Sequence, residues 1–203
     1  MYAFKRHGRL SKKEEYGVNK ITVKEVLLSA AAEVGLYYKV YAYLEEGEAE
    51  GLEATEALLR CFNLVENELA LDYLPLYAEE EVVTDTGTVY YSELSRPAVR
   101  VVKVEDAWGN DMPFRLFPEY LKTQGGTLKI RYAYVPAKKT VADDSDYHTL
   151  ASVRLFTYGI AAEYSLSIGL FEEAAVWDKK YKDAVTAAYR SNPCRVIQSR
   201  RWV

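Results

Sequence analysis

The hydrophobic period of this chain changes twice, and this constrains its fold more than any single residue does. Apolar residues recur at helical spacing over about 22–34 and 54–73, at strand spacing within 79–136, and at helical spacing again from 150 to 188. A period near 3.6 predicts an amphipathic helix, and a period of two predicts a half-buried strand. Helices and strands that are segregated along the chain are typical of α+β proteins.

The first helical segments have recognisable ends. Thr22 with Glu25 three residues later is a capping-box pattern, and Gly35 is suited to a helix C-terminus. The aromatic run 36–44 fits either an extension of this helix or a strand, and the pattern does not separate the two. Pro75 ends the second helix, because proline disfavours helix in the residue before it.

Turn signals divide the central segment into four to six short antiparallel strands. The triplet 85–87, Asp-Thr-Gly, lies between two β-rich runs and predicts a hairpin. The stretches 108–111 and 124–126 predict two further turns, and 127–134 alternates cleanly. Since each flanking helix has one apolar face to bury, we expect these helices to pack together. The fold class is therefore α+β: a four-helix bundle with an antiparallel β module inserted between helices two and three, and extended N- and C-terminal arms.

The expected boundaries are an N-terminal arm over 1–20, helices one and two over 21–77, the β module over 78–137, a helical hairpin of the same bundle over 138–192, and a C-terminal arm over 193–203. Asp143, Asp144 and Asp146 are placed to favour the N-terminus of the third helix. No stretch approaches the ~20 apolar residues of a membrane span, so we expect no membrane partner. The polar residues 1–20 do not fit a secretory signal.

The net charge of −4 conceals an uneven distribution. Residues 1–20 carry a net charge of +4, residues 190–203 carry +4, and the body between them carries −12. Basic tails could clamp DNA, but an acidic body repels it, and specific DNA readers carry a basic face on an ordered element. The distribution favours a protein that holds partners over one that reads nucleic acid.

Catalytic chemistry is sparse in this sequence. No nucleophile-elbow, zinc-protease or phosphate-loop motif occurs. His148 beside Asp144 and Asp146 is a candidate base, but a solvated histidine at a helix start is the favoured interpretation. Cys61 and Cys194 are too few for a disulfide framework, and Cys61 is expected in the core. We expect no enzyme activity, no catalytic residue, no cofactor and no metal.

Two features point to protein interfaces. The chain has 18 tyrosines, and amphipathic strands and an interface explain them equally well. The C-terminal arm places large apolar groups beside arginines, the types that dominate interface hot spots. Such an arm either folds back on its own body or docks on a partner, and docking is favoured. The residues of this arm are Arg195, Val196, Ile197, Arg200, Arg201, Trp202 and Val203.

This order of elements resembles the head–tail connector (adaptor) proteins of tailed bacteriophages, of the tail-tubular type. The resemblance covers roughly residues 21–203 and lies in the order of the elements and in the general character of their sequences. The stretches that carry it are LLRCFN at 58–63, ELALDY at 68–73, YGIAAEY at 158–164, GLFEEA at 169–174 and WDKKY at 177–181.

The resemblance implies a homo-oligomeric ring, commonly of twelve copies, in the neck of the virion, assembled in the host cytoplasm. The C-terminal arm would dock on the portal protein, and the β module would face a tail or tail-completion protein through loops that contain Trp108, Asn110 and Gln124. DNA would pass through the ring channel without being read. Two alternatives stay open: a tail-tube or tail-completion structural protein, and a non-viral protein-interaction module.

Overall fold

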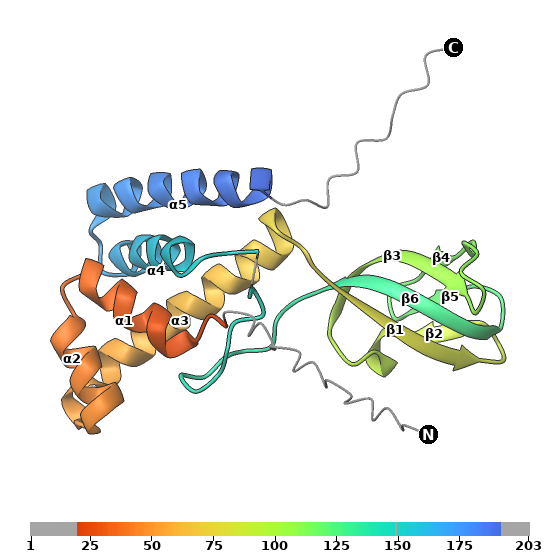
Figure 1. Cartoon of the computed structure of the whole chain (residues 1–203), viewed down its shortest axis with the longest axis horizontal. Coiled ribbons are helices and arrows are strands. Elements are labelled where there is room, and N and C mark those ends of the chain that lie inside the picture. The colour runs from red at the N-terminus through yellow and green to blue at the C-terminus, as the bar shows by residue number, and fades with distance from the viewer. Residues whose placement is uncertain (1–19, 149, 192–203) are drawn as a thin grey trace, which may run out of the picture.

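The computed structural model describes residues 20–148 and 150–191, and over these residues the protein is an α+β protein (Figure 1). The predicted arms, 1–20 and 193–203, lie outside the described residues except for Lys20. The helices are α1 (Val23–Glu33), α2 (Tyr37–Tyr41), α3 (Leu52–Glu68), α4 (Val153–Ser167) and α5 (Phe171–Ser191), with short π or 3-10 turns η1 (Ala42–Glu46), η2 (Ala49–Gly51), η3 (Leu69–Tyr73) and η4 (Tyr91–Glu93). The strands are β1 (Leu76–Thr84), β2 (Thr88–Tyr90), β3 (Ala98–Asp106), β4 (Arg115–Leu116), β5 (Tyr120–Lys122) and β6 (Gly126–Tyr134).

The N-terminal helices follow their local signals closely. The Thr22 side chain accepts a hydrogen bond from the backbone N–H of Glu25, which confirms the predicted cap of α1. Gly35 follows α1 with φ at 73°, a conformation that glycine adopts without strain. The ambiguous run 36–44 is helical, since it forms α2 and most of η1. The second predicted helix begins two residues earlier than expected, as α3, and η3 extends it to Tyr73.

Helix α4 is the centre of the helical part, because α1, α3 and α5 all pack against it (Figure 1). Its Phe156 ring stacks on Phe62 of α3 with a centroid distance of 5.2 Å. Gly159 allows the helices to approach closely, since a Cβ atom there would lie 2.8 Å from Cγ1 of Val65. The buried side chains of the five helices and of the chain before α4 form one apolar core with those of the strands.

The strands form two small antiparallel sheets, and all six lie in sequence between η3 and α4. The first sheet has the order β1-β6-β3, and β1 pairs with β6 over nine residues, from Leu76 opposite Tyr134 to Thr84 opposite Gly126. The second has the order β2-β5-β4. Within the part of the chain that the structure describes, no helix is both long and apolar enough to cross a membrane.

The predicted hairpin around residues 85–87 is wrong. The chain does bend there, with Gly87 at φ 70°, but β1 pairs with β6 and β2 pairs with β5. The backbone groups of β1 already find partners along the whole length of β6, and the N–H of Thr123 donates to the Gly87 carbonyl. The turn therefore connects a strand of one sheet to a strand of the other. A local turn pattern does not specify which strands pair after the turn.

Candidate interaction surfaces

An exposed tryptophan lies on a well-braced loop of the β strands. Trp108, between β3 and β4, is 86% exposed. The Asp106 carboxylate accepts hydrogen bonds from the backbone N–H groups of Trp108 and Asn110, each at 2.9 Å, and from the Asn110 side chain at 2.8 Å. These bonds, the Asn110 side chain first, lower the pKa of Asp106. Asn110 thus holds the loop that presents Trp108, while Gln124 is exposed in a separate turn between β5 and β6.

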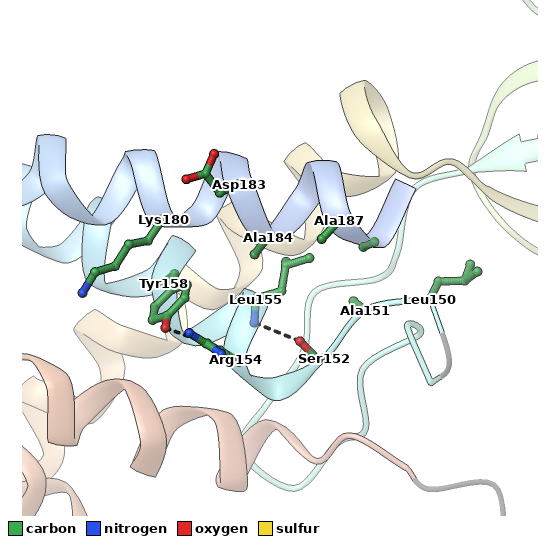
Figure 2. A pocket seen from close by; sticks show the side chains of 11 residues that line it. Leu150, Ala151, Ser152, Arg154, Leu155, Tyr158, Lys180, Asp183, Ala184 and Ala187 are labelled. Carbon is green, nitrogen blue, oxygen red and sulfur yellow. Dashed lines mark hydrogen bonds between the residues drawn. The ribbon is translucent and has the colours of Figure 1, made fainter. Parts of the chain in front are cut away.

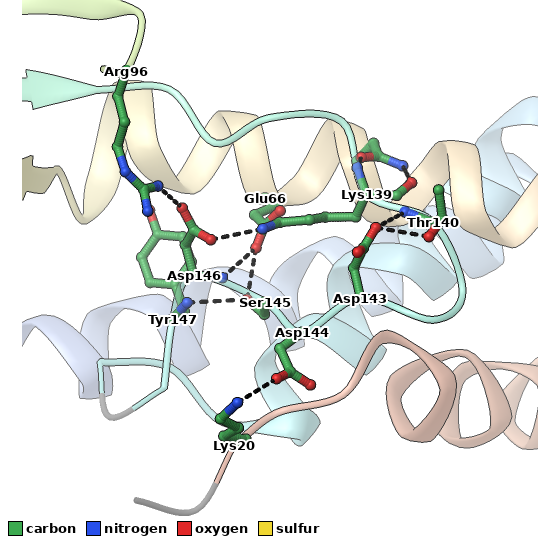
Figure 3. Close-up of polar contacts among 11 residues, drawn as sticks. Lys20, Glu66, Arg96, Lys139, Thr140, Asp143, Asp144, Ser145, Asp146 and Tyr147 are labelled. Carbon is green, nitrogen blue, oxygen red and sulfur yellow. Dashed lines mark hydrogen bonds and ion pairs between the residues drawn. The ribbon is translucent and has the colours of Figure 1, made fainter. Parts of the chain in front are cut away.

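A second feature is a polar cluster that ties the helices to the strands (Figure 3). Asp146, in the loop before α4, accepts from Nζ of Lys139 and from Nη1 of Arg96, each at 2.6 Å. Lys139 follows β6 and Arg96 precedes β3, and the end of β6 pairs with the start of β3, so one carboxylate joins two neighbouring strands, at one end of the sheet, to the helical part. Burial alone would raise the pKa of Asp146, but its bonds to Lys139 and Arg96 lower it.

The prediction that Asp143, Asp144 and Asp146 favour the N-terminus of the third helix is wrong. Helix α4 begins at Val153, and its N-cap is Ser152, whose side chain accepts from the N–H of Leu155. The three acids stabilise the preceding loop instead: Asp143 accepts from Thr140, Asp144 pairs with Lys20 at 3.0 Å, and Asp146 holds the cluster described above. The serine already satisfies the helix end, so the acids are free for the tertiary contacts.

Glu66 anchors the same loop from the side of α3. Only 1% exposed, it accepts hydrogen bonds at Oε1 from the Ser145 hydroxyl at 2.6 Å and from the Asp146 N–H at 3.1 Å (Figure 3). The Tyr147 hydroxyl donates to the Leu74 carbonyl at 2.8 Å. Burial raises the pKa of Glu66 above its ordinary value of 4.5, despite these hydrogen bonds.

The raised pKa of Glu66 predicts a pH-dependent contribution to stability. As the pH falls toward about 4.5, the folded protein takes up a proton at Glu66 that the unfolded chain does not, so the contribution of Glu66 to the free energy of unfolding rises. Glu66→Gln keeps an acceptor at the same position and removes this titration. Urea unfolding near pH 7 and near pH 5 should show wild type gaining stability relative to Glu66→Gln at the lower pH. Parallel pH dependences for the two proteins would contradict the expectation.

A pocket of about 660 Å³ lies between the start of α4 and the second half of α5 (Figure 2). We call it the α4–α5 pocket, and the lining residues used below are Arg154, Leu155, Tyr158, Lys180, Asp183 and Ala187. Nε of Arg154 donates to the Tyr158 hydroxyl at 2.6 Å, and Nζ of Lys180 lies 3.8 Å from the centre of a Trp177 ring. Aliphatic and aromatic groups therefore line a site with two cations at its edge.

A second hollow, of about 580 Å³, lies on α2 and the two short turns that follow it. We call this the acidic corner; the residues used below are Tyr37, Tyr38, Tyr41, Glu46, Glu48 and Glu50, and one base, Lys39, lines it beside the three glutamates. The Tyr37 and Tyr41 rings stack at a centroid distance of 5.7 Å, and Tyr38 is 87% exposed. The backbone of Gly51 packs against the carbonyl of Lys39 in α2. Only glycine fits there, because a Cβ atom at this position would collide with that carbonyl.

Neither His148 nor Cys61 lines the α4–α5 pocket or the acidic corner. His148 is exposed in the turn before α4. Cys61 is buried, as predicted, and burial raises the pKa of its thiol to about 11, which keeps it protonated and unreactive at neutral pH. Among residues 20–148 and 150–191, no three His, Cys, Asp or Glu side chains are grouped so that they could hold a metal ion.

Sequence reasoning missed both hollows on the helices. Glu46, Glu48 and Glu50 lie on or between the turns η1 and η2, where they line one pocket with the tyrosines of α2. No sequence pattern predicted the α4–α5 pocket, since its two walls are brought together only by the packing of α4 on α5. The predicted arm residues, 195–203, lie outside the described residues.

No model of a known protein family matches this chain, and no curated protein matches it either.

Proposed function

We propose that this protein is a structural virion protein, a tailed-phage head–tail connector of the tail-tubular type. In this proposal twelve copies form a ring in the neck that joins the portal to the tail and continues the DNA channel. The helical part is a four-helix bundle of α1, α3, α4 and α5, and the six strands are a module inserted into it. The subunit has no enzyme activity and assembles in the host cytoplasm.

The observation that carries the proposal is the two-part build of the chain. Helices and strands lie beside each other, and the cluster around Asp146 clamps their junction (Figures 1 and 3). The strands present Trp108 on a braced loop, and the helices present two further hollows. A subunit that joins neighbours, a portal and a tail needs separate contact surfaces on rigidly connected parts. An ordered, exposed tryptophan is the side chain expected at a protein–protein hot spot.

The portal contact falls to the C-terminal arm in this proposal. Its arginines and its tryptophan, Trp202, are suited to an acidic and apolar groove on a partner. The −12 charge of the body favours passage of DNA through the ring, since like charges keep the duplex from adhering to the wall.

The test is binding of the purified chain to the portal protein encoded in the same genome. Deletion of residues 194–203 should weaken portal binding at least about 100-fold and leave the melting temperature unchanged, because a hot-spot arm supplies several kcal/mol of binding energy. Biolayer interferometry on immobilised portal measures the affinity, and circular dichroism measures the melt.

Trp108→Ser is the matched control for this deletion. It removes an exposed tryptophan from the loop between β3 and β4, so portal binding should be retained while binding to the tail component falls. Unchanged portal affinity after the deletion would contradict the role of the arm. A genome with no portal gene would contradict the connector function itself.

A further inference from the structure

We infer that the α4–α5 pocket of one copy receives the acidic corner of a second copy, and that this contact repeats around the ring; the inference rests on the proposed ring-forming function. Both surfaces are formed by side chains of described helices and turns. We assign the occupant as a second copy of this chain, because the acidic corner complements the charge of the pocket. The surface that recognises it is basic and apolar.

The pocket supplies two cations that lack carboxylate partners. Within residues 20–148 and 150–191, neither Arg154 nor Lys180 forms an ion pair. Both are held in place by aromatic groups: Arg154 by the Tyr158 hydroxyl (Figure 2), and Lys180 by the Trp177 ring. Asp183 is the one acid that lines the pocket, so the site carries a net positive charge over an apolar lining. Ordered cations of this kind favour an acidic partner that also offers apolar area.

The acidic corner supplies the complementary groups. Over the same described residues, Glu46, Glu48 and Glu50 form no ion pair, whereas the neighbouring Glu45 is paired with Lys24 at 2.9 Å. Tyr38 projects beside these glutamates as the most exposed large apolar side chain of the helices. A tyrosine that enters the apolar pocket would bring the three carboxylates to its cationic edge. Aromatic side chains that are surrounded by charged groups of complementary sign are typical interface anchors.

The positions of the two surfaces favour a ring over a closed pair. Helix α5 and the turns around α2 lie on opposite sides of the helical part (Figure 1). A contact between unlike patches on different sides of a subunit is heterologous, and it closes into a ring when the rotation per subunit allows it. The C-terminal arm, which follows α5 in the sequence, is a poorer occupant, because residues 192–203 carry three arginines and no acidic side chain.

Charge reversal tests the pairing. Arg154→Glu with Lys180→Glu reverses the pocket, and Glu48→Lys with Glu50→Lys reverses the corner. Each double variant should weaken self-association at least about tenfold, because like charges then face each other across the contact. An equimolar mixture of the two should restore assembly, since each reversed surface meets its complement on the other protein. Sedimentation velocity measures the assembly state.

The control is Arg100→Glu with Arg115→Glu, a matched charge change at exposed positions on β3 and β4, which should leave assembly unchanged. Tyr38→Ala adds an uncharged probe of the same contact and should also weaken assembly, while melting temperatures stay at the wild-type value. A mixture that restores assembly supports the pairing of these two surfaces.

The outcomes separate the contact from the function. If wild type assembles and the reversals have no effect, or the mixture fails to restore assembly, the assigned contact is wrong and the ring proposal stands. If only the pocket reversal and the deletion of residues 194–203 weaken assembly, the arm is the occupant and the inference is overturned. A wild-type chain that stays monomeric both alone and with portal overturns the ring proposal and the contact together.

Discussion

Replacing Phe156 by alanine is expected to lower the free energy of unfolding by about 3–5 kcal/mol. The Phe156 ring is 0% exposed, stacks on Phe62 and meets the Tyr147 ring edge-on at 6.0 Å. Because α4 packs against three other helices, a cavity at this position removes contacts that no single neighbour can refill. The loss combines the transfer energy of the ring with the cost of the cavity.

Urea unfolding followed by circular dichroism measures this loss. Phe171→Ala is the matched control: it removes the same ring from the first residue of α5, where the side chain is 68% exposed, and should change stability by less than about 0.5 kcal/mol. A loss below about 1 kcal/mol for Phe156→Ala would show that the core around α4 is not packed as described.

Asp146→Ala is expected to cost about 3 kcal/mol, at the lower end of the range for breaking a buried ion pair. Its carboxylate and the Lys139 ammonium are both largely buried, so removing the acid leaves an unpaired charge in the interior. The bond to Arg96 adds less, because that guanidinium is about half exposed and solvent screens it. The lost free energy is that of the contacts that hold the helices and the strands together.

Two measurements distinguish this effect from an ordinary surface change. The pKa of Asp146 is lowered in the folded protein, so its stabilisation is present above the ordinary value of 3.8 and is lost as the pH falls through the folded value. Asp144→Ala, which breaks the exposed pair with Lys20, should cost less than about 1 kcal/mol at neutral pH. Hydrogen exchange should speed up in the loop 139–147 of Asp146→Ala but not of Asp144→Ala. Equal costs for the two variants would contradict the clamp.

The local elements of this protein were largely predictable. Thr22 caps α1, Gly35 follows α1 with φ at 73°, and the strand over 127–134 forms as β6. Each of these depends on residues a few positions apart, where backbone preference and side-chain period act directly. The α+β class followed from the same patterns, because the helical and strand periods are segregated along the chain.

Pairings between distant residues were not predictable. The Asp-Thr-Gly triplet at 85–87 marks a bend, but only the complete sheets show that β1 and β2 part there. Three aspartates before α4 looked like helix-start charges, and Ser152 performs that role instead. The partners of Asp146 lie 7 and 50 residues away, and the partner of Ser145 lies 79 residues away. No local pattern distinguishes an acid that caps a helix from one that clamps two parts of a fold.

Some features of the candidate surfaces could also be predicted from the sequence, and others appear only in the tertiary structure. From the sequence alone come the basic arms, the acidic body and the turn that contains Trp108, because charge and turn chemistry are properties of consecutive residues. The tertiary structure alone decided that Arg154 and Lys180 edge one pocket and that the acids at 46–50 surround a tyrosine cluster. The α4–α5 pocket exists because helix packing brings together two helices, and in both surfaces burial against neighbouring groups, not sequence spacing, selects the side chains that remain exposed.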